Sequence, residues 1–135
     1  LWLVAPPDLP RPDTSAESDV TPVPAAVRWT PRPEEAWQVH DGRTRRAFAP
    51  VPVLRLSSLP TLRDAVVAGA GAALLPRSLV GGDVAAGRLA CWGWLEGPPT
   101  ELWALHTSRR LVSPKVTAFV AHLATALSTD LSANR

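Results

Sequence analysis

Two adjacent serines, Ser57 and Ser58, are the residues of this chain best placed to hold a ligand. They follow a β-type run at 51–56 and precede a predicted helix at 59–68, which a glycine turn connects to an apolar run at 72–75. The first N–H groups of a helix lack partners within the helix, and together with serine hydroxyls they can bind an anion or a carboxylate. By pattern alone this is a β-α-β unit, and most such units only build the fold. In that simpler alternative, Ser58 caps the helix.

The other reactive side chains form no recognisable catalytic or metal-binding pattern. His40, His106 and His122 lie far apart in the sequence, and none has a cysteine or carboxylate at metal-ligand spacing. Cys91 is interpreted as a small core residue, because no histidine pattern accompanies it. We therefore expect no enzyme activity, no cofactor and no metal site.

The composition is that of one soluble domain. Of the 135 residues, 46% are hydrophobic and 19% are charged, and no apolar run is long enough to span a bilayer. The single cysteine cannot form an internal disulfide, which suits a reducing compartment, so we expect a cytoplasmic protein without a membrane partner. The net charge is only +2. Even the cluster of Arg43, Arg45 and Arg46 fits a solvated sheet edge better than a nucleic-acid contact.

Turn and cap residues divide the chain into the short elements that would position the two serines. Asp41-Gly42 predicts a hairpin between strands at 36–40 and 45–48, because glycine there supplies a positive φ at low cost. The remaining elements predicted in this part are strands at 1–5, 25–30, 51–56, 72–75, 89–95 and 101–106, the helix at 59–68 and a helical turn at 77–80.

A final amphipathic helix is predicted from Ser113 to about residue 128. Ser113 is a suitable N-cap, and Pro114 would occupy the first helical position, where its missing N–H costs nothing. The apolar residues that follow recur at the spacing of one helix face: Val116, Phe119, Val120, Leu123 and Leu127.

Five phrases of the sequence occur in an order that is typical of one protein family. The longest is SSLPTLRDAVVAGAGAALLPRSLV at 57–80, with a serine loop, a helix ending in Ala-Gly-Ala-Gly and a strand ending in Leu-Pro. The others are Trp37–Arg43, Asp83–Leu89, Trp103–His106 and Ser108–Phe119. Together they resemble the effector-binding domain of LysR-type transcriptional regulators, mostly its second lobe and its C-terminal helix.

This resemblance implies an α/β fold, namely a lobe of the periplasmic-binding-protein-like type II fold with a mixed sheet flanked by helices. Residues 1–5 would be the last strand of a first lobe that is largely missing, and the proline-rich residues 6–24 would cross to the second lobe. The second lobe would span 25–112, followed by a closing helix at 113–130 and a tail at 131–135.

By the same resemblance, the domain would sense a small-molecule effector without catalysis, and a carboxylate is one candidate. The family's cleft, carried over by position, places effector binding at Ser57, Ser58, Leu59, Arg28, Gly69 and Ala70. DNA would be bound only through an N-terminal helix-turn-helix domain outside this chain, and the whole regulator would be a homo-oligomer. The alternative is a solute-binding protein of a transporter with the same type II fold, which would need a secretion signal upstream.

Overall fold

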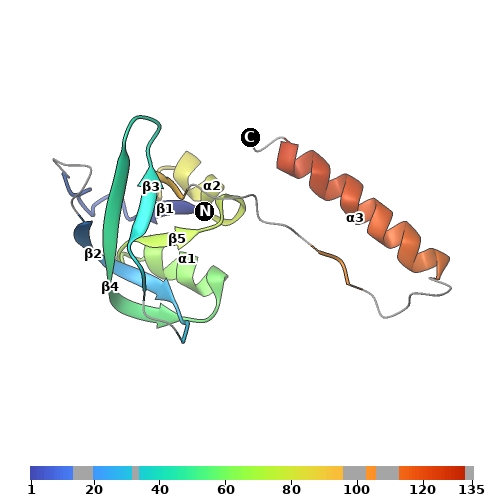
Figure 1. Cartoon of the computed structure of the whole chain (residues 1–135), viewed down its shortest axis with the longest axis horizontal. Helices are drawn as coiled ribbons and strands as arrows, with labels where there is room; N and C mark the ends of the chain where they lie inside the picture. Colours follow the sequence, from blue (N-terminus) through green and yellow to red (C-terminus); the bar gives the residue numbers. More distant parts are fainter. Residues whose placement is uncertain (14–19, 32–33, 96–102, 106–112, 133–135) are drawn as a thin grey trace. The chain divides into compact units, whose positions relative to one another are not determined.

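The computed structural model describes residues 1–13, 20–31, 34–95, 103–105 and 113–132, which fall into two units, Leu1–Gly97 and Pro98–Arg135 (Figure 1). The second unit contains helix α3 (Pro114–Ser132). The elements of the first unit are, in chain order, β1 (Trp2–Ala5), β2 (Val20–Arg28), β3 (Trp37–His40), β4 (Arg45–Leu56), α1 (Leu59–Val67), β5 (Ala73–Leu75), α2 (Arg77–Ala85) and β6 (Ala90–Leu95).

The strands of the first unit form one mixed, six-stranded sheet in the order β2-β4-β3-β6-β1-β5. β2 is parallel to β4, whereas β3 is antiparallel to β4 and β6, and β1 is antiparallel to β5 and β6. The sheet also curls, because Ala25 on β2 bridges in parallel to Ala72, directly before β5. The N–H of Ala26 donates to Ala72 O at 2.9 Å, and the N–H of Ala72 donates to Pro24 O at 2.8 Å. As a result, β2, β4 and β5 run in one direction and end at the same side of the sheet.

Gly71 allows this close approach between the β2 edge and the segment before β5. Its φ is +96°, and a Cβ atom at this position would lie 2.5 Å from the carbonyl oxygen of Pro24. Only a residue without a side chain fits here without displacing the Pro24 backbone.

The helices α1 and α2 pack on one face of the sheet. Leu62 and Val66 are four residues apart on α1, so they lie on one helix face, and both are buried in a cluster with Val4, Leu75 and Val80. The mixed sheet with flanking helices, as predicted from the sequence, is therefore confirmed.

A second apolar cluster lies on the opposite face of the sheet. Successive residues of a strand point to opposite faces, so Leu3 belongs to this cluster while its neighbour Val4 belongs to the first. Phe48 and Trp92 are both buried here, with ring centroids 5.8 Å apart. The sheet is thus covered on both faces by apolar side chains.

A buried carboxylate connects α1 to α2. Asp83 on α2 is 2% exposed and accepts hydrogen bonds from Nε of Arg63 on α1 at 2.6 Å and from Nε of Arg88 at 2.8 Å. The Arg63 guanidinium, and after it that of Arg88, holds the pKa of Asp83 below its usual value against the opposing effect of burial. Two arginines therefore satisfy the charge that the α1–α2 contact buries.

Two of the predicted boundaries at the start of the chain are wrong. Leu1–Ala5 was assigned to a separate first lobe, yet β1 lies between β5 and β6 in the same sheet as all the other strands. The linker predicted at 6–24 extends too far, because β2 begins at Val20 and Val23 is buried. In both cases the decisive contacts are with strands far along the chain.

β4 is one continuous strand where the sequence analysis predicted two. The strand contains Pro50 and Pro52, and proline has no N–H to donate to a neighbouring strand. β3 pairs only with residues 45–48 of β4. Both prolines lie beyond this range, where β2 is the one named strand that pairs with β4. A stretch of strand with a single neighbour has fewer ladder hydrogen bonds to lose to a proline.

The other predicted elements agree with the structure to within a few residues. The hairpin across Asp41-Gly42, the helix at 59–68 and the strands at 72–75 and 89–95 are confirmed. The turn at 77–80 is the first part of the longer helix α2. α3 begins as predicted, with the N–H groups of Val116 and Thr117 donating to Ser113 O, and ends four residues later than predicted, at Ser132. Within the predicted strand at 101–106, residues 103–105 are not in a strand and the others lie outside the described residues.

Candidate functional site: a pocket at the ends of the parallel strands

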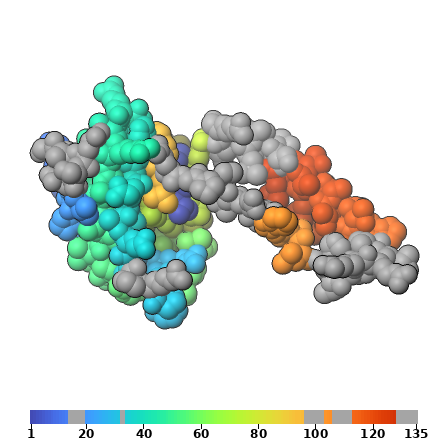
Figure 2. Space-filling view, in the orientation of Figure 1, coloured from blue at the N-terminus to red at the C-terminus, as the bar shows by residue number. Residues whose placement is uncertain are grey.

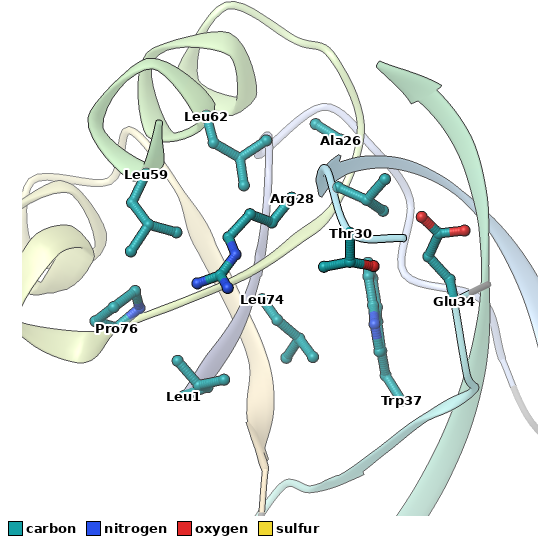
Figure 3. Close-up of a pocket in the computed structure, with 11 residues that line it drawn as sticks. Leu1, Ala26, Arg28, Thr30, Glu34, Trp37, Leu59, Leu62, Leu74 and Pro76 are labelled. Carbon is teal, nitrogen blue, oxygen red and sulfur yellow. The ribbon is translucent and has the colours of Figure 1, made fainter. Parts of the chain in front are cut away.

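A pocket of about 290 Å³ opens where β2 and β5 end and α1 begins (Figure 3). The parallel arrangement of β2, β4 and β5 brings their carboxyl ends to this side of the sheet. Ligand sites in open α/β sheets lie at the carboxyl ends of the strands, and small-molecule pockets start at roughly 300 Å³. The position and size therefore suit a small organic molecule.

The walls of the pocket are mostly apolar, with a few polar groups. The apolar lining consists of Leu1, Ala26, Val27, Trp37, Leu59, Leu62, Leu74 and Pro76, and the polar lining of Arg28, Thr30 and Glu34. Apolar walls with a small number of placed polar groups are typical of sites for small ligands.

Arg28 is the cation of this pocket. It is the last residue of β2, and its guanidinium extends along the pocket towards Leu59 and Pro76 (Figure 3). Within the described part of the chain, the side chain of Arg28 makes no hydrogen bond, ion pair or ring contact with another residue. Its five N–H donors are therefore available to a ligand, and a guanidinium favours planar anions such as carboxylates.

Glu34 supplies a carboxylate on another part of the wall, and it is already paired. Both of its oxygens accept from the guanidinium of Arg55 on β4, with 3.1 Å between Nη2 and Oε2. The Glu34 side chain is 14% exposed and that of Arg55 is 45% exposed. The hydrogen bonds from Arg55 lower the pKa of Glu34, so the carboxylate stays ionised at neutral pH.

Two of the six residues predicted to bind an effector, Arg28 and Leu59, come together in the pocket. Ser57 and Ser58 are exposed and do not line it. The Ser58 hydroxyl instead caps α1, since its Oγ accepts from the backbone N–H of Thr61 at 3.4 Å and from the Thr61 hydroxyl at 3.1 Å. The simpler alternative for Ser58, a helix cap, is thus confirmed.

Gly69 and Ala70 lie beyond the other end of α1. A helix of nine residues is about 13 Å long at 1.5 Å per residue, so they are well separated from Leu59 at its start. Gly69 is exposed with a φ of +97°, and Ala70 packs against the first apolar cluster. Neither residue lines the pocket.

The sequence analysis did not identify most of the pocket lining. Leu74 and Pro76 could have been found, because they lie at the carboxyl end of an expected parallel strand, where ligands bind. Glu34 and Trp37 gave no comparable indication. They come after β2 in the sequence, and only the folded chain shows that both residues line the pocket.

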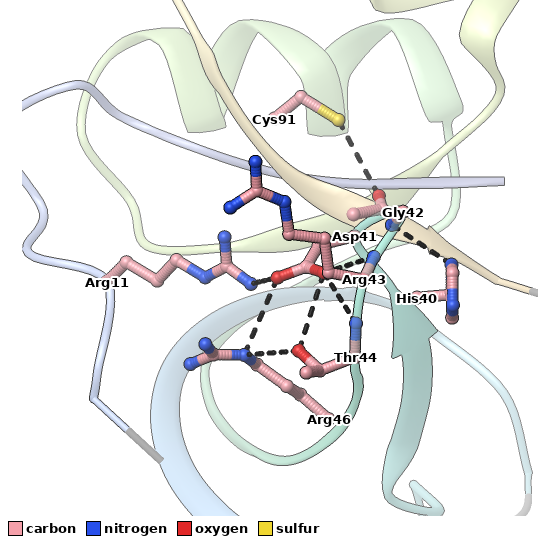
Figure 4. A network of polar contacts seen from close by, with 9 residues as sticks. Arg11, His40, Asp41, Gly42, Arg43, Thr44, Arg46 and Cys91 are labelled. Carbon is pink, nitrogen blue, oxygen red and sulfur yellow. Dashed lines mark hydrogen bonds and ion pairs between the residues drawn. The ribbon is translucent and has the colours of Figure 1, made fainter. Parts of the chain in front are cut away.

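A polar network at the β3–β4 hairpin stabilises the turn (Figure 4). Oδ1 of Asp41 accepts from the backbone N–H groups of Thr44 at 3.0 Å and Arg43 at 3.1 Å. Oδ2 pairs with Arg11 at 2.8 Å and with Arg46 at 3.6 Å. The backbone donors of Thr44 and Arg43, and then Arg11, hold the pKa of Asp41 well below its usual range. This hairpin extends beyond the rest of its unit (Figures 1 and 2), and its carboxylate partly offsets the arginine cluster.

Cys91 on β6 is half-buried, and its thiol donates to the carbonyl oxygen of Gly93 with 3.6 Å between the heavy atoms. Burial raises the pKa of this thiol. A thiol that stays protonated is a weak nucleophile, which fits a packing role.

In the described ranges, His, Cys, Asp and Glu side chains form no group of three or more that could hold a metal ion. None of the helices in these ranges is long and apolar enough to cross a membrane.

Comparison with known proteins identifies the family. The chain matches the family model of the LysR substrate binding domain over residues 1–128. A curated HTH-type transcriptional regulator from Xanthomonas campestris pv. campestris (strain 8004) is 35% identical over 96 residues, which make up 70% of this chain and 28% of the relative.

Similar solved structures include the regulatory domain of AphB from Vibrio vulnificus, with 20% identity, a TM-score of 0.46 and coverage of 67% of this chain and 46% of that one. CrgA, a LysR-type transcriptional regulator from Neisseria meningitidis, is 23% identical with a TM-score of 0.47, over 67% of this chain and 31% of that chain. The family match and the curated relative favour the regulator over a transporter component. The chain therefore belongs to the family of LysR substrate-binding domains.

Proposed function

We propose that this domain senses a small-molecule effector for a transcriptional regulator, and that it binds the effector in the pocket between β2, β5 and α1. One observation carries the proposal: an arginine without a described partner, Arg28, lines an otherwise mostly apolar pocket. Arg28 is exposed to solvent at the pocket, and its guanidinium favours a ligand that brings a negative charge. The proposed role is binding without catalysis.

The proposed effector carries an anionic group, such as a carboxylate, that pairs with Arg28. Leu59, the first residue of α1, lines the same pocket, so the positive end of the helix dipole lies close to the guanidinium. The apolar side chains of Leu62 and Leu74 would contact the rest of the molecule. This division of polar and apolar walls favours an amphiphilic acid.

Binding would act on transcription by favouring one arrangement of the regulator over another. A ligand shifts a conformational equilibrium only as far as it binds one state more tightly than the other. The chain spans 28% of its curated relative, and we propose that the rest of the protein supplies DNA binding and the contacts of a homo-oligomer. Such a regulator would work in the cytoplasm, where it meets its operator.

A thermal-shift screen of small organic acids tests the proposed site. Wild type, Arg28→Ala and Arg43→Ala are compared, because Arg43 is an exposed arginine that does not line the pocket. A ligand that binds the folded state stabilises it by RT ln(1 + [L]/Kd), so acids that bind should raise the Tm of wild type and of Arg43→Ala. The Arg28→Ala variant should lose this shift. Acids that stabilise all three proteins equally would refute the site.

A further inference from the structure

We infer that Glu34 makes the pocket selective for ligands with a single negative charge. The inference rests on the proposed binding of an anion at Arg28 and adds a residue that decides which anions are accepted. A ligand that presents a second carboxylate to this wall would be rejected.

The two charged residues of the pocket wall have opposite signs and lie apart. Arg28 ends β2, whereas Glu34 precedes β3 after the intervening loop. Figure 3 shows the Arg28 guanidinium directed towards Leu59 and Pro76, and the Glu34 side chain on the other side of Thr30. A ligand anchored by its carboxylate at Arg28 and extending across the pocket would bring its far end towards Glu34.

Glu34 lines the pocket, whereas its counter-ion does not. Arg55 binds both oxygens of Glu34, yet Arg55 is 45% exposed and is not a lining residue. The carboxylate cannot turn away without losing two charge-assisted hydrogen bonds. It also cannot donate a hydrogen bond, because an ionised carboxylate only accepts.

A second ligand carboxylate would therefore meet a fixed like charge beside apolar walls. Arg55 offsets part of the Glu34 charge, but its guanidinium is held by both Glu34 oxygens and does not line the pocket, so the like charges still oppose binding. An uncharged alkyl end would instead contact Trp37 and Leu74. With a volume of about 290 Å³, the pocket suits a monocarboxylate with a short aliphatic or cyclic body.

Hexanoate and hexanedioate are matched probes, because they have the same number of carbons and differ by one carboxylate. Their dissociation constants are measured with the full chain by ¹⁵N–¹H chemical-shift titration, which tolerates weak binding. Wild type should bind hexanoate at least about tenfold more tightly than hexanedioate. Arg28→Gln should weaken the binding of both.

Variants of Glu34 provide the decisive comparison. Glu34→Gln keeps the shape of the side chain and should reduce the preference to less than about threefold by improving hexanedioate binding. Glu34→Ala removes the carboxylate and releases the Arg55 guanidinium, so it should reverse the preference. Glu35→Gln is the control, because Glu35 is exposed, is not a lining residue, and should leave the preference unchanged.

The outcomes separate this inference from the proposed function. Equal binding of both probes by wild type, or an unchanged preference in both Glu34 variants, would overturn the inference while leaving the anion site at Arg28 intact. Failure of wild type to bind either probe at millimolar concentrations, or binding that Arg28→Gln does not affect, would overturn the anion site itself.

Discussion

Replacing Gly71 with alanine tests the junction at which the sheet curls. The new Cβ would lie 2.5 Å from the carbonyl oxygen of Pro24, whereas ordinary contacts begin at 3.4 Å. The Pro24 backbone would have to move by about 1 Å, and its carbonyl accepts the N–H of Ala72. The movement would also strain the neighbouring bond from Ala26 to Ala72.

The expected loss of stability can be worked from these contacts. Holding alanine at a φ of +96° costs roughly 1–2 kcal/mol. Weakening the two backbone hydrogen bonds adds about 0.5–1.5 kcal/mol for each. Gly71→Ala should therefore lower the free energy of unfolding by about 2–5 kcal/mol.

Gly69→Ala is the matched control, two residues away. Its φ of +97° is nearly the same, but a Cβ there would meet nothing within 4 Å, so only the backbone cost of roughly 1–2 kcal/mol applies. Urea unfolding of the wild type and both variants, followed by tryptophan fluorescence, measures the difference at constant m value. Equal destabilisation by the two substitutions would show that the Pro24 contact is not a constraint and would refute the reasoning.

Three further outcomes are expected. Arg63 lowers the pKa of Asp83, so the ionised carboxylate stabilises the fold at pH values above the ordinary pKa of 3.8, and this stabilisation is lost as the pH falls below 3.8. Asp83→Asn should therefore lower the Tm at pH 7, and the difference in Tm from wild type should shrink in acid. Ser58→Ala should cost about 1 kcal/mol in urea unfolding through the lost α1 cap, whereas Ser57→Ala should have almost no effect. Phe119 is 62% exposed on α3 and should promote self-association of the chain, so light scattering should find Phe119→Glu more monomeric than wild type. An unchanged mass would exclude the apolar face of α3 as a contact between chains.

Local residues were sufficient to predict the elements whose ends they specify. Ser58 caps α1, Asp41-Gly42 forms the hairpin turn with a φ of +94° at Gly42, and Ser113 precedes the first turn of α3. Each of these boundaries depends on hydrogen bonds between residues a few positions apart, so the sequence contains the necessary information.

Features that depend on distant partners could not be predicted in this way. Val20–Pro24 contains two prolines and looks like a linker, yet it forms a strand because β4 supplies a parallel partner over its whole length. Arg28 could be proposed for the site because of its position in the family resemblance, whereas no feature of the sequence indicated Glu34. Glu34 lines the pocket together with residues distant in the sequence, and neither periodicity nor a helix cap indicates this position.

The position of β1 between β6 and β5 also has a consequence for how the chain acquires its structure during synthesis. Trp2 pairs with Leu75 and with Trp94, so the two partners of this first strand leave the ribosome about 70 and about 90 residues after it. Until then, this short and very apolar segment lacks both of its native neighbours, and its backbone donors remain open to other chains. Contacts this distant in sequence slow folding, so closing the sheet around β1 should be a late and rate-limiting event.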